Sequence, residues 1–191
     1  GCLWRQAKSL ADRDRPKEHS MPVTNSKINV RPMSVHIGAE IEDVDLTQPL
    51  LAGTVSEIRQ ALLKWKVVFF RDQHLDHFQQ VQFARHFGAL TPGHVVFGHD
   101  ETYPEIYSVS KFRTATQNAA PPTTRPWSGW HTDVTAALNP PAASILRGDV
   151  VPPYGGDTQW TNLVTAYENL SPTFREMLDK LRGVHRFEAK A

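Results

Sequence analysis

Three stretches of the chain carry apolar residues at the spacing of a helix that buries one face. Helix starts are expected at Thr54 and Asp76, each followed three residues later by Glu or Gln, and at Ser171, which precedes a proline. The second helix is expected to end at Gly88. The expected core faces are Val55, Ile58, Leu62 and Trp65 in the first helix, Phe78, Val81, Ala84 and Phe87 in the second, and Phe174, Met177, Leu178 and Leu181 in the third.

Short runs of apolar or alternating residues predict strands around these helices. The runs cover residues 28–31, 35–37, 67–70, 106–109, 142–146, 158–160 and 184–187. Pro32 and Gly38 interrupt the first two runs, whereas the run 67–70, Val-Val-Phe-Phe, is wholly apolar and favours a buried strand. The chain is therefore expected to combine strands and helices.

Length and composition narrow the class of protein. A chain of 191 residues suits one domain, and the charged residues 1–20 are expected to be a disordered or non-native extension before a domain in residues 21–191. The formal net charge of +1 does not favour a nucleic-acid partner. No apolar run approaches the roughly 18–20 residues of a membrane span, so no membrane partner is expected. Cys2 is the only cysteine, which fits a reducing, cytoplasmic compartment.

The strongest chemical pattern lies in the run Ser128-Gly129-Trp130-His131-Thr132-Asp133-Val134-Thr135. In an extended segment, His131 and Asp133 would project to the same side and could bind one ion. An imidazole and a carboxylate are two of the three ligands in the two-histidine, one-carboxylate set that holds non-haem Fe(II). Because such a pair also arises by chance in a chain with nine histidines, the neighbouring motifs must decide.

Several motifs follow one another in an order that resembles a known family. They are Val67-Val68-Phe69-Phe70-Arg71, Phe83-Ala84-Arg85-His86-Phe87-Gly88, Trp130-His131-Thr132-Asp133-Val134-Thr135, Pro141-Ala142-Ala143 and Gly155-Gly156-Asp157-Thr158. This series resembles the taurine dioxygenase (TauD/TfdA) family of Fe(II)- and 2-oxoglutarate-dependent dioxygenases, over roughly residues 28–187. The resemblance implies a mainly β fold with flanking helices (α+β), a double-stranded β-helix or jelly roll.

The resemblance also implies roles for individual residues. His131 and Asp133 would be the first two iron ligands, and the Thr158 hydroxyl would help to bind the far carboxylate of 2-oxoglutarate. The family reaction uses O₂ to oxidise an organic substrate while 2-oxoglutarate is converted to succinate and CO₂. A plain hairpin turn is the alternative interpretation of residues 155–158, and one segment can serve both purposes.

The substrate implied by the resemblance is a small organic acid. His94 falls where family members that oxidise sulfonates or sulfates place a histidine on the anion; the alternative is an ordinary surface histidine. Phe97 and Trp127 replace polar residues of the taurine-specific form, which suits a sulfonate, alkyl sulfate or aryloxy acid with an apolar group. The proline-rich stretch 111–128 is either a lid over the site or a surface excursion.

The sequence departs from the family in its second half. The second iron histidine and the arginine that pairs with 2-oxoglutarate lie, in the family, beyond the last residue here. His185 is the only histidine after Asp133, but it corresponds to a structural histidine, so no metal role is transferred to it. The expectation is an N-terminal part of a dioxygenase that is inactive alone. Its incomplete jelly roll would leave strand edges bare and favour pairing with another chain, a homo-oligomer included.

Two other function classes remain open at this point. A degenerate jelly-roll fragment could bind a ligand or a partner chain without chemistry, which the incomplete ligand set favours and the intact His131, Asp133 and Thr158 disfavour. A zinc hydrolase would need three protein ligands and a base beside an open position, and only His131 and Asp133 present themselves.

Overall fold

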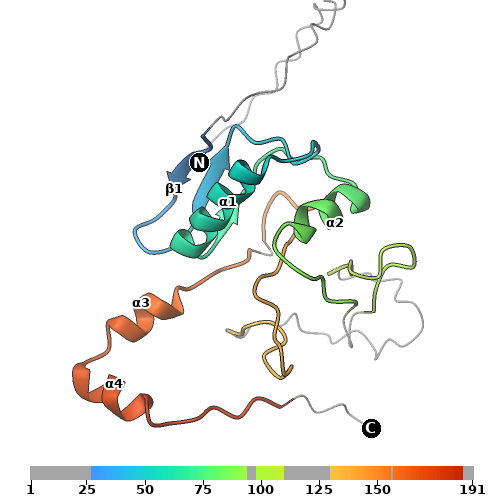
Figure 1. The fold of residues 1–191 in the computed structure, drawn as a ribbon. Coiled ribbons are helices and arrows are strands. Elements are labelled where there is room, and N and C mark those ends of the chain that lie inside the picture. The colour runs from blue at the N-terminus through green and yellow to red at the C-terminus, as the bar shows by residue number, and fades with distance from the viewer. Residues whose placement is uncertain (1–26, 94–97, 110–129, 156, 187–191) are drawn as a thin grey trace, which may run out of the picture.

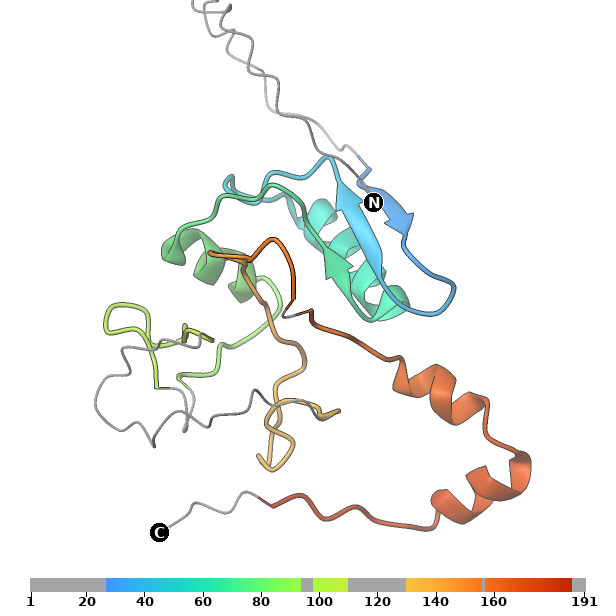
Figure 2. The ribbon, with the colours of Figure 1, turned by 180° about the vertical axis from the view of Figure 1, so that it is seen from behind.

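The computed structural model describes residues 27–93, 98–109, 130–155 and 157–186. The helices and strands, in chain order, are β1 (Asn29–Pro32), β2 (Ala39–Glu42), α1 (Ala52–Trp65), β3 (Val68–Phe69), α2 (His77–Arg85), α3 (Leu163–Glu168) and α4 (Pro172–Leu178). The sheet, α1 and α2 gather in residues 27–93, here called the N-terminal unit, whereas α3 and α4 lie apart from it in both views (Figures 1 and 2).

The sheet of the N-terminal unit has three strands in the order β1-β2-β3. β1 and β2 are antiparallel, and β2 and β3 are parallel with α1 as the connection between them. Residues 35–37, expected as a strand, instead belong to the turn between β1 and β2. Gly38 ends this turn with a φ of 87°, a conformation that favours glycine, and β2 begins directly after it.

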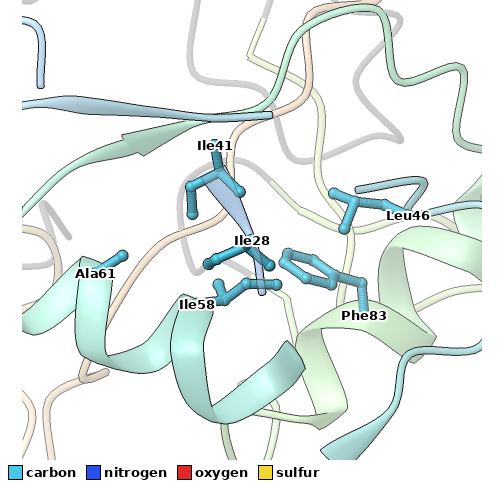
Figure 3. Packing of buried hydrophobic residues seen from close by; sticks show 6 residues of the cluster. All are labelled: Ile28, Ile41, Leu46, Ile58, Ala61 and Phe83. Carbon is cyan, nitrogen blue, oxygen red and sulfur yellow. The ribbon is translucent and has the colours of Figure 1, made fainter. Parts of the chain in front are cut away.

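A small apolar core lies between the sheet and the two helices (Figure 3). Its buried members are Ile28, Ile41, Leu46, Ile58, Ala61 and Phe83. Ile58 is only 1% exposed, as its position on the expected face of α1 predicts. Val55, Leu62 and Trp65 from the same expected face are only half-buried. The three-stranded sheet is too narrow to cover a wide stripe of the helix, so Ala61 fills the position beside Ile58.

The start of α1 differs from the expected capping box. The helix begins at Ala52, and its N-cap, Leu51, makes no side-chain cap hydrogen bond. The Glu57 carboxylate instead accepts a hydrogen bond from the backbone N–H of Ile28, at 2.8 Å. Ile28 is buried, and an unpaired N–H there would cost free energy. The Glu57 side chain, expected to accept a hydrogen bond within a capping box, therefore accepts one from Ile28.

The capping box expected at α2 is confirmed. The Asp76 carboxylate accepts from the Gln79 backbone N–H at 2.7 Å, and the Gln79 side chain accepts from the Asp76 backbone N–H at 2.9 Å. Within α2, Val81 is buried as expected, but Phe83 is buried in place of Phe78, which is 53% exposed. The buried face of α2 is therefore rotated from the predicted face toward Phe83.

Replacing Asp76 with alanine should destabilise the N-terminal unit by about 1 kcal/mol, because the backbone N–H of Gln79 loses its partner. Asp76→Asn keeps a side-chain oxygen at the cap and should lose only a fraction of that free energy. Urea unfolding followed by circular dichroism measures both changes. Equal losses for the two variants would show that the cap does not act through its hydrogen bond.

The second half of the described chain contains helices but no strand. Residues 106–109, 142–146, 158–160 and 184–186, expected to be extended in strands, run as irregular chain. α4 begins as expected, with the Ser171 hydroxyl accepting from the Phe174 N–H at 3.3 Å. The predicted core residue Phe174 is 57% exposed, however, and Leu181, which lies beyond the end of α4 at Leu178, is 63% exposed. The described residues thus form a small mixed sheet with helices, and the expected jelly roll is not formed among them.

A strand needs a neighbour for its backbone hydrogen bonds, whereas a capped helix start satisfies its own. This explains why the second half of the described chain forms helices but no strand. α3 was not predicted from the sequence, although Asn162 is a favourable N-cap residue and its side chain accepts hydrogen bonds from the N–H groups of Val164 and Thr165. In the described part of the chain, no helix has both the length and the apolar character to cross a bilayer.

Candidate metal site

His131 and Asp133 lie close together in irregular chain at the start of a turn. The segment is not a strand, yet the His131 Nε2 and the Asp133 Oδ1 are 3.3 Å apart. The turn continues through Val134, which has a φ of 51°, and closes with a hydrogen bond from the Ala137 N–H to the Val134 carbonyl at 3.1 Å. About half of each side chain is exposed, so both donor atoms can be reached from solvent.

The geometry of this pair fits two neighbouring ligands of one metal ion. Ligand atoms at right angles on an ion, each about 2.1 Å from it, lie about 3.0 Å apart, close to the separation of Nε2 and Oδ1 here. One imidazole nitrogen and one carboxylate oxygen are also the donor types that non-haem Fe(II) takes. Among the described residues, no third His, Cys, Asp or Glu joins the pair in a group that could hold a metal.

One hydroxyl group contacts the pair, and a second lies on the same turn. The Ser144 hydroxyl donates a hydrogen bond to the Asp133 Oδ2 at 2.8 Å. The His185 Nδ1 lies 2.9 Å from the Thr135 hydroxyl, two residues beyond Asp133. His185 is thus held beside the turn by a hydrogen bond to a hydroxyl.

Arg147 ties the segment after the pair to the start of α2, and the two run side by side in Figure 2. Its guanidinium donates to the Leu75 carbonyl at 2.9 Å and lies 3.1 Å from the His77 Nδ1. The Arg147 side chain is only 15% exposed, and its Nε also donates to the Asp149 carboxylate at 2.8 Å. We call this set of contacts the Arg147 clamp.

The clamp should weaken in acid, because the Arg147 hydrogen bond holds the pKa of Asp149 below its ordinary value. A carboxyl with a lowered pKa contributes stability above its unfolded pKa of about 4 and loses it as the pH falls through the folded pKa. Wild type should therefore exceed Asp149→Asn in stability at pH 6, by at most about 1 kcal/mol because Asp149 is exposed, and this difference should shrink as the pH falls below about 4. Urea unfolding at several pH values measures the difference; a gap that is constant with pH would contradict this account.

Asp100 lies at the other side of His77. Its pKa is lowered chiefly by hydrogen bonds from the backbone N–H groups of Tyr103 and Thr102. The His77 Nε2 is 3.9 Å from the Asp100 Oδ2. The contacts of Arg147, His77 and Asp100 therefore connect three segments that are distant in sequence.

Of the remaining predicted site residues, Thr158 lies in the described part of the chain. Thr158 is exposed, in irregular chain after a turn in which Gly155 has a φ of 77°. Its segment lies against the sheet, where the Trp160 ring meets Phe69 edge-on with centroids 5.5 Å apart. The role of Thr158 toward 2-oxoglutarate stays a prediction. His94, Phe97, Trp127 and the whole stretch 111–128 lie outside the described residues.

The contacts of Ser144 and Arg147 were not predicted from the sequence. Ser144 lies 11 residues beyond Asp133, in the run 142–146 that was interpreted only as a strand, and Arg147 directly follows that run. A single serine or arginine in such a run carries no local signal of its partner. The arginine offers one hint, because a charged residue directly after an apolar run needs a partner when its side chain is buried.

The family description "Taurine catabolism dioxygenase TauD, TfdA family" matches residues 29–191. The chain belongs to the TauD/TfdA family. Family members act as oxidoreductases that use 2-oxoglutarate, Fe(II) and O₂, so the resemblance inferred from the ordered motifs is confirmed.

Different TauD/TfdA relatives of this chain are named for different substrates. The chain is 40% identical over 163 residues to the α-ketoglutarate-dependent sulfate ester dioxygenase of Pseudomonas putida. The matched region covers 85% of this chain and 50% of that protein. It is 32% identical over 164 residues to the α-ketoglutarate-dependent 2,4-dichlorophenoxyacetate dioxygenase of Cupriavidus pinatubonensis, covering 81% and 56%. The chain thus spans about half the length of the curated relatives it matches.

A solved structure of a taurine dioxygenase from Burkholderia xenovorans is similar to this TauD/TfdA chain in both sequence and fold. The two share 58% sequence identity with a TM-score of 0.73, over 84% of this chain and 54% of the other. At this level of identity, the agreement extends from the sequence motifs to the arrangement of the backbone.

Proposed function

We propose that this chain supplies part of the active site of an Fe(II)- and 2-oxoglutarate-dependent dioxygenase that oxidises a small organic acid. The observation that carries the proposal is the 3.3 Å approach of the His131 Nε2 to the Asp133 Oδ1, in the part of the chain that matches the TauD/TfdA family. Membership of the family supports the class of reaction, whereas the approach of these two atoms supports His131 and Asp133 as the metal ligands.

The proposed roles are those that the family resemblance implies, and the chemistry of each residue fits its role. His131 and Asp133 hold the metal through one nitrogen and one oxygen. When bound, the iron activates O₂ as 2-oxoglutarate is converted to succinate and CO₂. The Thr158 hydroxyl donates a hydrogen bond to the far carboxylate of 2-oxoglutarate. His94 contacts the anionic group of the substrate, and Phe97 lies against its apolar part.

The substrate class is a sulfate ester, a sulfonate or an aryloxy acid. Relatives named for a sulfate ester and for 2,4-dichlorophenoxyacetate support the first and the last, and a relative from Saccharomyces cerevisiae, 28% identical, is named for a sulfonate. These substrates share an anionic group joined to an apolar group. A histidine and a phenylalanine are residue types that suit the anionic and the apolar part of such a molecule.

The described residues supply two protein ligands, so we expect the 191-residue chain to bind iron weakly and to show no turnover by itself. The same observation favours a second candidate function, a degenerate fragment that binds a ligand or partner without chemistry. The two functions differ in whether the chain takes up Fe(II) together with 2-oxoglutarate.

An anaerobic titration distinguishes them. Fe(II) added to the chain with 2-oxoglutarate should give a weak visible charge-transfer band that neither component gives alone, and His131→Ala should abolish it. His74→Ala, which removes an exposed histidine elsewhere, is the matched control and should leave the band unchanged. The absence of both a band and metal uptake in the wild-type chain would reject the dioxygenase site and support the binding fragment.

A further inference from the structure

We propose that Ser144 is a positioning residue, which holds the Asp133 carboxylate so that one of its oxygens faces His131. The inference rests on the proposed function and adds a residue to the same site. The two oxygens of Asp133 have different partners: Oδ2 accepts the Ser144 hydrogen bond at 2.8 Å, and Oδ1 lies 3.3 Å from the His131 Nε2.

The separate partners of the two Asp133 oxygens matter because Asp133 lies on an exposed turn. Its side chain is 45% exposed, and without a partner it would exchange among several orientations in water. A hydrogen bond to a charged oxygen is stronger than one between neutral groups, so Ser144 selects one orientation. The selected orientation leaves Oδ1 beside the imidazole nitrogen, where both can bind one ion.

The Arg147 clamp explains why Ser144 is itself held in place. Arg147 follows Ser144 by three residues and joins the segment to the Leu75 carbonyl and to His77, at the start of α2. The N-terminal unit is the part of the described chain that has a buried core. Ser144 thus connects an exposed turn to that unit, with Arg147 as the anchor.

Mn(II) binding measures the role of Ser144 without turnover. The electron paramagnetic resonance signal of free Mn(II) gives the dissociation constant of the 191-residue chain at pH 7. Ser144→Ala should weaken binding by about 10- to 100-fold, the effect typical of removing a hydrogen-bond partner of a metal ligand. Ser144→Thr keeps the hydroxyl and should bind within about threefold of wild type. Ser34→Ala, which removes a hydroxyl from the turn between β1 and β2, should have no effect.

The outcomes separate this inference from the proposed function. If Asp133→Ala abolishes binding but Ser144→Ala binds as wild type does, the positioning role is wrong and the metal site stands. If Ser144→Ala and Ser144→Thr lose affinity equally, the hydroxyl is not the cause and the inference is also wrong. If wild type binds no Mn(II), or binds it no better than Asp133→Ala, both proposals fail. Loss in Ser144→Ala with recovery in Ser144→Thr supports the inference.

Discussion

Replacing Ile58 with alanine is expected to destabilise the N-terminal unit by about 2–5 kcal/mol. Ile58 is the most deeply buried large side chain, 1% exposed, and belongs to the cluster that includes Ile28, Ile41 and Phe83 (Figure 3). The change removes three carbon atoms from the centre of this cluster and leaves a cavity that a small sheet cannot close. Urea unfolding of the two proteins measures the difference.

Leu63 provides the matched control for Ile58. It lies on the same helix with 66% of its surface exposed, so Leu63→Ala should change the free energy of unfolding by less than about 0.5 kcal/mol. Similar losses for Ile58→Ala and Leu63→Ala would show that α1 does not pack on the sheet through the face described.

Removing either proposed ligand should have the largest effect on metal binding. His131→Ala and Asp133→Ala are each expected to weaken Mn(II) binding by more than about 100-fold, because the loss of a ligand exceeds that of a group beside it. The free Mn(II) signal measures both. His185→Ala is the control, since His185 lies beside the same turn but bonds to the Thr135 hydroxyl, and its loss should weaken binding by less than about threefold.

Features set by neighbouring residues were predictable from the sequence. The Asp76 capping box and the Ser171 cap depend on contacts within one helical turn, and both form as expected. His131 and Asp133 do come together, but through a turn and not through the predicted strand, so the geometry that brings them together was not predicted. Local chemistry was enough to place the two caps.

Features that depend on distant partners were not predictable in the same way. The Thr54–Glu57 capping box fails because Glu57 binds the backbone of Ile28, 29 residues away. The strand expected at residues 142–146 lacks a paired neighbour, and its segment is instead held by Arg147 at a carbonyl 72 residues away. No local pattern shows which distant group a side chain will meet, so such contacts require the three-dimensional structure.

The central claim is that His131 and Asp133 take up the same metal ion, and nuclear magnetic resonance tests it most directly. Mn(II) added below stoichiometry to the isotope-labelled chain broadens the signals of nuclei near the bound ion. The account predicts that the signals of residues 130–135 and of Ser144 broaden first. Broadening centred on another group, such as His77 and Asp100, or spread evenly along the chain, would contradict it.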